Sequence, residues 1–192
     1  MACEFITKGK LATACMDSIG GVKNYYFALW GDYGITVAAG EVSSLGTLAQ
    51  VFKYEVTGNA NSLTENLNTS MENMTAFVTQ VASATFQGLN KDLQVQLSLL
   101  AKSRTLVFEE DYNGNIKLMG LTNGAYGSAG TAVTGAAKGD LSGYTIELTA
   151  EEKEFAPFLS SGAISALKAA IVDKYVGSAD IPVVTTPTTP KV

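Results

Sequence analysis

Residues 62–86 decide the fold, and they read SLTENLNTSMENMTAFVTQVASATF. From Ser62 onward every second side chain is polar, while Leu63 and Leu67 lie on the opposite face. This period of two is typical of a half-buried β-strand. The same start also matches a helix capping box, but the five alternating polar positions up to Ser70 favour the strand.

The rest of this stretch predicts the partner strand. Residues 75–86 are rich in Thr, Val and Phe, which are enriched in strands, so we expect a hairpin that turns near Met71–Met74. A second hairpin is expected at Asn113-Gly114, because Asn-Gly between two alternating runs is the strongest short turn signal. Further strands are predicted at 22–30, 35–38, 50–57, 104–110, 116–119 and 144–149.

Two helices are expected. Asn90 is the predicted cap of a helix over 91–101, which carries an apolar stripe of leucines. Ser161 is the predicted cap of a helix over 162–176, which Gly177 would end. The sequence therefore predicts a mainly β fold, a sandwich or barrel of antiparallel strands with a flanking α-helix and a C-terminal helix.

The chain is expected to form a single domain over residues 1–177, followed by a Pro/Thr-rich C-terminal arm over 178–192. Residues 120–143 contain seven glycines with Ala, Ser and Thr between them. Such a stretch can bury little apolar surface, so it predicts a long loop. A loop of this length inside a compact domain is uncommon and is usually functional or disordered.

The composition argues against several classes of function. The 192 residues include 13 Lys+Arg and 18 Asp+Glu, for a net charge of −5, and no basic run that could grip nucleic-acid phosphates. The absence of His excludes His-based triads, and Cys3 and Cys15 are too few for a disulfide framework or a four-thiolate zinc site. With no signal-peptide pattern and no apolar run of membrane-spanning length, a soluble protein is expected.

Two acidic clusters and one aromatic cluster are candidate sites. Residues 109–111 read EED and residues 151–154 read EEKE, but nothing in the sequence places these carboxylates in one cleft, so we predict a solvated charged face. The aromatic cluster could stack on bases or sugars, but with only Lys23 nearby we expect a core or an interface. Its members are Tyr25, Tyr26, Phe27 and Trp30. We therefore predict no catalytic, cofactor-binding or metal-binding residues, and no enzymatic activity.

The order of features between residues 50 and 158 carries a resemblance. An alternating strand leads into NSLTENLNTSMEN at 61–73, and VFEEDYNGN follows at 107–115. Next come TAVTGAAKGDLSGYT at 131–145, in which GDLSGY is the most specific piece, and FAPFL at 155–159. In this order the chain resembles phage tail-tube proteins, whose fold is shared with injection-system and type VI secretion tube proteins.

The resemblance implies a ring-forming structural protein of a virion tail, assembled in the host cytoplasm. Each subunit would be a small β-sandwich that gives two hairpins to the inner barrel of a hexameric ring. Rings would stack into a tube through which double-stranded DNA is ejected without specific binding. The expected partners are further copies of the chain and other phage tail or portal proteins, and no membrane is involved.

The resemblance also suggests roles for particular residues. The expected lumen-facing residues are Ser62, Thr64, Glu65, Asn66, Asn68 and Glu72. Residues 59–88 contain no Lys or Arg, which would let DNA slide past. The expected contacts between rings or subunits come from the 120–143 loop, at Gly124, Gly127, Gly130, Gly135 and Lys138.

Three alternatives stay open. A ring, adaptor or hub protein of a short tail, between portal and tail, would use the same fold. A carbohydrate- or receptor-binding β module at a tail tip would expose Tyr25, Tyr26 or Trp30. An enzyme would need a measured turnover that depends on acidic residues such as Glu109, Glu110 or Glu152.

Overall fold

The computed structural model describes residues 8–12, 16–58, 60–172 and 174–176, and in these the chain is mainly β with two helices. The predicted arm over 178–192 and the predicted stop at Gly177 lie outside the described residues. The strands form two sheets. Sheet I has the order β2-β3-β11-β8-β7-β1-β4 and sheet II the order β5-β6-β10-β9.

The bounds of the elements are as follows. Sheet I contains β1 (Val22–Leu29), β2 (Thr36–Ala38), β3 (Glu41–Ser44), β4 (Phe52–Glu55), β7 (Thr105–Asp111), β8 (Ile116–Met119) and β11 (Phe158–Leu159). Sheet II contains β5 (Ser62–Ser70), β6 (Thr75–Gln87), β9 (Tyr126–Val133) and β10 (Gly143–Glu152). The helices are α1 (Lys91–Lys102) and α2 (Ser161–Ala169). Among the described strands every pair is antiparallel except β3 with β11.

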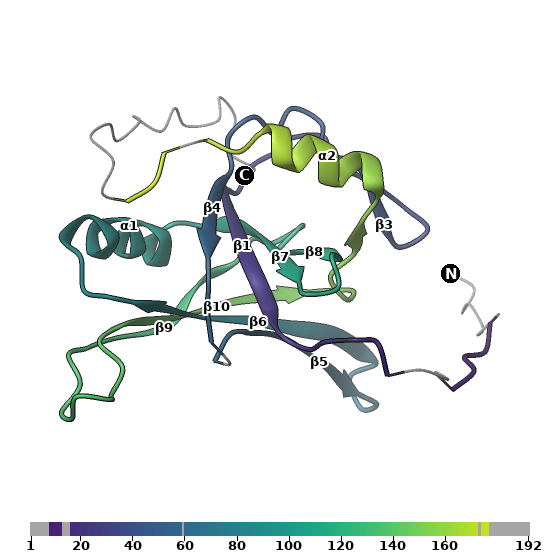
Figure 1. The fold of residues 1–192 in the computed structure, drawn as a ribbon. Coiled ribbons are helices and arrows are strands. Elements are labelled where there is room, and N and C mark those ends of the chain that lie inside the picture. Colours follow the sequence, from purple (N-terminus) through teal and green to yellow (C-terminus); the bar gives the residue numbers. More distant parts are fainter. Residues whose placement is uncertain (1–7, 13–15, 59, 173, 177–192) are drawn as a thin grey trace.

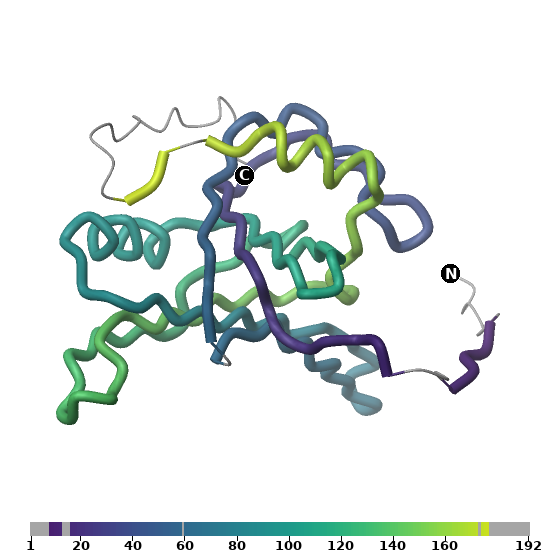
Figure 2. The backbone as a smooth tube through the Cα atoms, viewed as in Figure 1, coloured from purple at the N-terminus to yellow at the C-terminus, as the bar shows by residue number. Residues whose placement is uncertain are grey.

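The molecule is layered, with sheet II below, sheet I in the middle and α2 above in the view of Figures 1 and 2. Helix α1 lies beside sheet I, over the β9 end of sheet II. The antiparallel sandwich predicted from the sequence is confirmed. In the described part of the chain neither sheet closes on itself, so a single copy is not a barrel.

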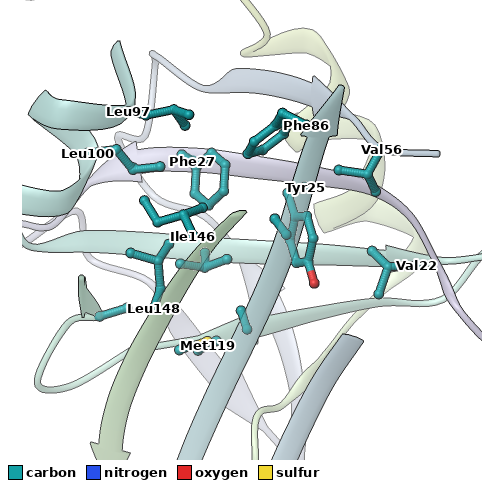
Figure 3. Packing of buried hydrophobic residues seen from close by; sticks show 14 of the residues in the cluster. Val22, Tyr25, Phe27, Val56, Phe86, Leu97, Leu100, Met119, Ile146 and Leu148 are labelled. Carbon is teal, nitrogen blue, oxygen red and sulfur yellow. The ribbon is translucent and has the colours of Figure 1, made fainter. Parts of the chain in front are cut away.

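The main core fills the space between the two sheets (Figure 3). Tyr25 of β1 crosses this space, and its hydroxyl donates to the backbone carbonyls of Ser62 and Ser83 in sheet II, both at 2.9 Å. Phe27 lies beside it and meets the Tyr54 ring edge-on, with ring centroids 5.2 Å apart. The predicted burial of the aromatic cluster is therefore confirmed for its tyrosines and for Phe27.

A second core separates sheet I from α2. Tyr26, Leu106 and Phe108 point to this side of sheet I and pack with Leu167 of the helix. Because side chains alternate along a strand, β1 and β7 supply both cores at once. This explains why their sequences read as almost continuous apolar runs.

Most predicted elements are confirmed, with small shifts of their ends. The strand reading of residues 62–70 is correct, and its hairpin turns at Met71–Met74 as predicted. The Asn113-Gly114 turn joins β7 to β8, and Gly114 takes a positive φ of 85°. Asn90 caps α1 by accepting a hydrogen bond from the backbone N–H of Asp92 at 2.8 Å. The sequence did not predict β3, β9 or β11.

The predicted loop over 120–143 is wrong at its centre, because residues 126–133 form β9. Gly127 lies under α1, and a Cβ added there would be 2.8 Å from the Cα and the carbonyl oxygen of Ala101. The glycines and alanines of this stretch therefore let a helix lie close to a strand, rather than making the chain flexible. Only residues 134–142 remain as the turn between β9 and β10.

The second helix is shorter than predicted. Its cap is Ser160 and not Ser161 as predicted, because the Ser160 hydroxyl accepts from the backbone N–H of Ala163 at 3.3 Å. The helix ends at Ala169 instead of Val176. The backbone beyond it pairs with Val51, which donates to the carbonyl of Ala170 and accepts from the N–H of Val172. These strand-like bonds replace the helical ones and end the helix.

Candidate functional site

The outer face of sheet II is the candidate site, because no described helix or strand covers it (Figure 1). Its side chains are mostly Ser, Thr and Asn. The predicted residues Ser62, Thr64, Asn66 and Asn68 are exposed on this face. Beside them lie Thr79, Val81, Ser83, Thr85, Thr131, Thr145, Glu147, Thr149 and Glu151.

The register of β5 and β6 explains this arrangement. Asn66 pairs with Thr79 and Ser62 pairs with Ser83, so polar side chains stand opposite one another across the two strands. The Asn68 amide also donates to the Thr79 hydroxyl at 2.9 Å. The sequence prediction missed the contribution of β10, although the alternation of residues 144–149 placed Thr145, Glu147 and Thr149 on one face.

Glu65 was predicted to share this face, and that prediction is wrong. By the period of two, Glu65 points to the opposite side of β5, between the sheets. Its carboxylate accepts from the Lys117 ammonium at 2.6 Å and from the backbone N–H of Ala156 at 2.6 Å. The sequence signal was available, because Glu65 occupies the same parity as Leu63 and Leu67. Glu72 lies in the exposed turn between β5 and β6, beyond the sheet itself.

The outer face is negative and contains no cation. The strands of sheet II have no Lys or Arg in their sequences, and Glu147 and Glu151 lie on the outer side of β10. A polyanion such as DNA gains no counterion release on a surface of this kind. The face can therefore lie next to DNA without holding it.

The two edges of sheet II are long and unpaired. In the described part of the chain β5 pairs only with β6, and β9 pairs only with β10. These edge strands have nine and eight residues, whereas the edge strands of sheet I, β2 and β4, have three and four. A long exposed edge is a template for another strand, and soluble monomers normally avoid it. The edges are therefore the part of the surface best suited to self-association.

The predicted contact residues in 120–143 occupy three different settings. Gly127 and Gly130 belong to β9, so these two are not loop residues as predicted. Gly124 lies in the turn before β9, where an added Cβ would be 2.9 Å from the Trp30 ring. Gly135 and Lys138 do lie in the 134–142 turn. Within this turn the Asp140 carboxylate accepts from the backbone N–H groups of Ala137 and Ala136 at 2.7 and 2.9 Å. These bonds hold the pKa of Asp140 below its ordinary value.

The acidic clusters are not the solvated face that the sequence predicted, because three of their glutamates are buried. Glu110 accepts hydrogen bonds from the Tyr26 hydroxyl and the Asn24 amide. Burial opposes its ionisation, but these bonds outweigh burial and lower the pKa of Glu110. Glu152 accepts from the backbone N–H groups of Thr122 and Asn123 at 2.9 and 2.8 Å, so it closes a turn.

Glu109 differs from both of these acids. It lies on the other side of β7 from Glu110, in a cleft between the sheets, and it is 7% exposed. No described residue donates a hydrogen bond to it or pairs with it within 4 Å. Burial, with a smaller contribution from the Asp111 charge, raises the pKa of Glu109 to about 7, while Lys117 opposes the rise.

The aromatic cluster predicted from the sequence forms no exposed platform, whereas Phe77 and Tyr126 are 41% and 47% exposed on the outer face of sheet II. Tyr25 and Tyr26 are 0% and 2% exposed, and Trp30 is half-buried beneath the Arg104 guanidinium, 4.5 Å from its ring centroid. In the described ranges no group of His, Cys, Asp and Glu is arranged to hold a metal. Those same ranges contain no helix with the length and apolarity to cross a membrane. Comparisons of the chain with protein-family models, curated proteins and solved structures gave no match.

Proposed function

We propose that the chain is a structural protein of a phage tail, and that sheet II of several copies joins into the wall of a ring-shaped channel. The observation that carries this proposal is the form of sheet II: two hairpins with both outer edges unpaired and a bare, cation-free outer face. Closing such sheets into a ring removes every edge.

The strand directions favour this closure. The order β5-β6-β10-β9 alternates in direction at every step, so β5 and β9 run in opposite directions. When β9 of one copy lies beside β5 of the next, the new pair is antiparallel and continues the pattern. Six copies of the four strands would form a barrel roughly 50 Å across between backbones, at about 4.8 Å per strand and a tilt of about 40°. That width leaves room for a DNA duplex.

The chemistry of the outer face supports a conduit in preference to a DNA-binding protein. Small hydroxyl and amide side chains remain hydrated, and the carboxylates of Glu147 and Glu151 repel phosphates. Tyr25 and Tyr26 are buried, so they do not form the aromatic platform that the sequence suggested for a sugar-binding tail-tip module.

Electron microscopy of the purified chain, over a concentration series, tests this proposal. We expect rings with a central channel, and tubes where rings stack. A chain that remains monomeric at every concentration, as measured by analytical ultracentrifugation, contradicts the proposal.

A deletion separates a long tube from a single ring of a short tail. We propose the 134–142 turn as the stacking contact, because it extends beyond the sheet between β9 and β10 (Figure 1). Deletion of residues 136–139 shortens this turn and leaves both strands intact. Tubes in the parent and separate rings in the deletion variant are expected; separate rings in the parent indicate the short-tail ring or adaptor.

A further inference from the structure

A cleft opens between the two sheets beside the free edge of β5. It has a volume of about 680 Å³, and Leu63, Glu109, Asp111 and Lys117 are among its lining residues. The Lys117 ammonium is already bound to Glu65, and the Asp111 carboxylate accepts from Asn113 and Asn115. Glu109 is therefore the carboxylate in this cleft that accepts no hydrogen bond from a described residue, and its oxygens keep a small contact with solvent through the cleft.

A buried carboxylate of this kind requires a cation or a proton. The local charges are the carboxylates of Glu65, Glu109 and Asp111 against the single ammonium of Lys117, with Glu110 on the far side of β7. The elements around Glu109 supply no second cation. The cleft thus has an excess of negative charge and is open to a positively charged side chain from outside.

A basic helix face lies at the opposite edge of the same sheet. Helix α1 packs over β9, and its outer side exposes Val95 and Leu99, which are 50% and 58% exposed, between Lys91 and Lys102. The apolar pair has no cover among the described residues. Its flanking lysines are complementary in charge to the cleft.

The topology relates the helix face and the cleft. Both lie on the inner side of sheet II, the cleft at the β5 edge and α1 at the β9 edge. Joining β9 of one copy to β5 of the next therefore carries α1 to the side of the neighbouring cleft. The lengths are compatible: α1 is about 18 Å long, and β5 covers about 13 Å from Leu63 at the cleft to the exposed Leu67.

We propose that the outer face of α1 docks against the cleft beside β5 of a neighbouring copy. A lysine of the helix, Lys91 or Lys102, then donates hydrogen bonds to the Glu109 carboxylate. Val95 and Leu99 cover the apolar surface around Leu67. This inference rests on the proposed function, since it assigns a contact that accompanies the joining of β5 and β9.

Charge exchange between two variants tests the contact. Glu109→Lys alone and the double variant Lys91→Glu/Lys102→Glu alone should each reduce ring yield at least tenfold, because each places like charges together. An equimolar mixture should recover rings, because every junction in an alternating ring then joins opposite charges. The double variant Lys8→Glu/Lys10→Glu changes the net charge equally, at residues that belong neither to α1 nor to the cleft lining, and should assemble like the parent.

Circular dichroism checks that each variant folds. If Glu109→Lys does not fold, Glu109→Gln replaces it in the test. We expect the glutamine variant to need a several-fold higher concentration to assemble. If Glu109→Gln and Lys91→Glu/Lys102→Glu both assemble like the parent, this inference is overturned and the proposed ring is not affected. Failure of the parent itself to assemble contradicts both.

Discussion

Side chains alternate between the two faces in both sheets, but the faces of sheet I and sheet II differ in burial. In sheet I the central strand β7 is buried on both faces: Leu106, Val107 and Phe108 are each 0% exposed. In sheet II one face is just as apolar, while the other is polar and bare. The edges differ in the same sense, since sheet I ends in short strands and sheet II in long ones. Sheet I therefore exposes only short edges, and sheet II is the sheet that we propose to be completed by other copies.

The largest effect should come from a matched pair of leucines. Leu106→Ala removes a fully buried side chain of sheet I and should lower the free energy of unfolding by about 2–5 kcal/mol. Leu67→Ala, at the edge of sheet II, should cost less than about 1 kcal/mol, because Leu67 is 55% exposed. Urea unfolding at a concentration where the chain is monomeric measures both. Equal losses would contradict the distinction between the two sheets.

Two neighbouring glutamates on β7 should respond oppositely to neutralisation. The pKa of Glu109 is about 7 against an ordinary 4.5, so its folded form holds a proton more tightly than the unfolded chain. Stability should therefore fall as the pH rises from about 4.5 to about 7, by roughly 2–3 kcal/mol. At pH 8, Glu109→Gln should unfold at a higher urea concentration than the parent.

Glu110 provides the opposite case. Its pKa is lowered, so its contribution to stability is present above the ordinary value and is lost as the pH falls through the folded pKa. Glu110→Gln leaves the Tyr26 hydroxyl and the Asn24 amide without their charged acceptor and should cost about 1–3 kcal/mol at pH 8. Urea unfolding of the two glutamine variants in parallel gives the comparison, and a shift of the same sign in both would refute it.

Alanine substitutions at two glycines of the predicted loop should differ in their effect on stability, by a smaller amount than the changes above. Gly127→Ala places a methyl group 2.8 Å from the backbone of Ala101, so α1 must shift, at a cost of about 1–3 kcal/mol. Gly139→Ala meets nothing within 4 Å and should be nearly neutral. Thermal unfolding distinguishes them. A neutral Gly127→Ala would mean that close packing of α1 on β9 does not require this glycine.

The smallest effect on stability should come from the outer face of sheet II, where function should change instead. Thr64→Lys/Asn66→Lys should leave unfolding almost unchanged but make assembled rings bind duplex DNA, with an affinity that falls as salt rises. The control, Thr36→Lys/Ser43→Lys, adds two exposed lysines on sheet I. Filter binding over a salt series compares them, and equal DNA binding by both variants would contradict a channel lined by sheet II.

Local signals in the sequence predicted the fold where one periodicity dominated. The alternation over 62–70 predicted both the strand and its polar face, and Asn113-Gly114 predicted the turn between β7 and β8. Prediction failed where a distant partner decides the structure. In the sequence Gly127 resembles a loop residue, but in the structure α1 packs against it. Residues 170–172 continue a helical pattern in the sequence, but in the structure they pair with Val51.

The candidate site was predictable only in part. The polar row of β5 followed from the sequence, whereas the burial of Glu109, Glu110 and Glu152 did not, because adjacent acids are usually solvated. Glu110 contacts Tyr26 and Asn24, and Glu152 contacts the 122–123 turn, and all of these partners are remote in sequence from the acids. The unpaired edges of sheet II follow from the order of its strands, which the sequence did not predict.

Hydrogen exchange, measured by mass spectrometry on monomeric and assembled chain, tests the central claim most directly. If β9 of one copy pairs with β5 of the next, assembly should protect backbone amides in β5 and β9, while those in β2 and β4 exchange as before. Protection confined to sheet I, or none in either edge of sheet II, would contradict a channel wall built from sheet II.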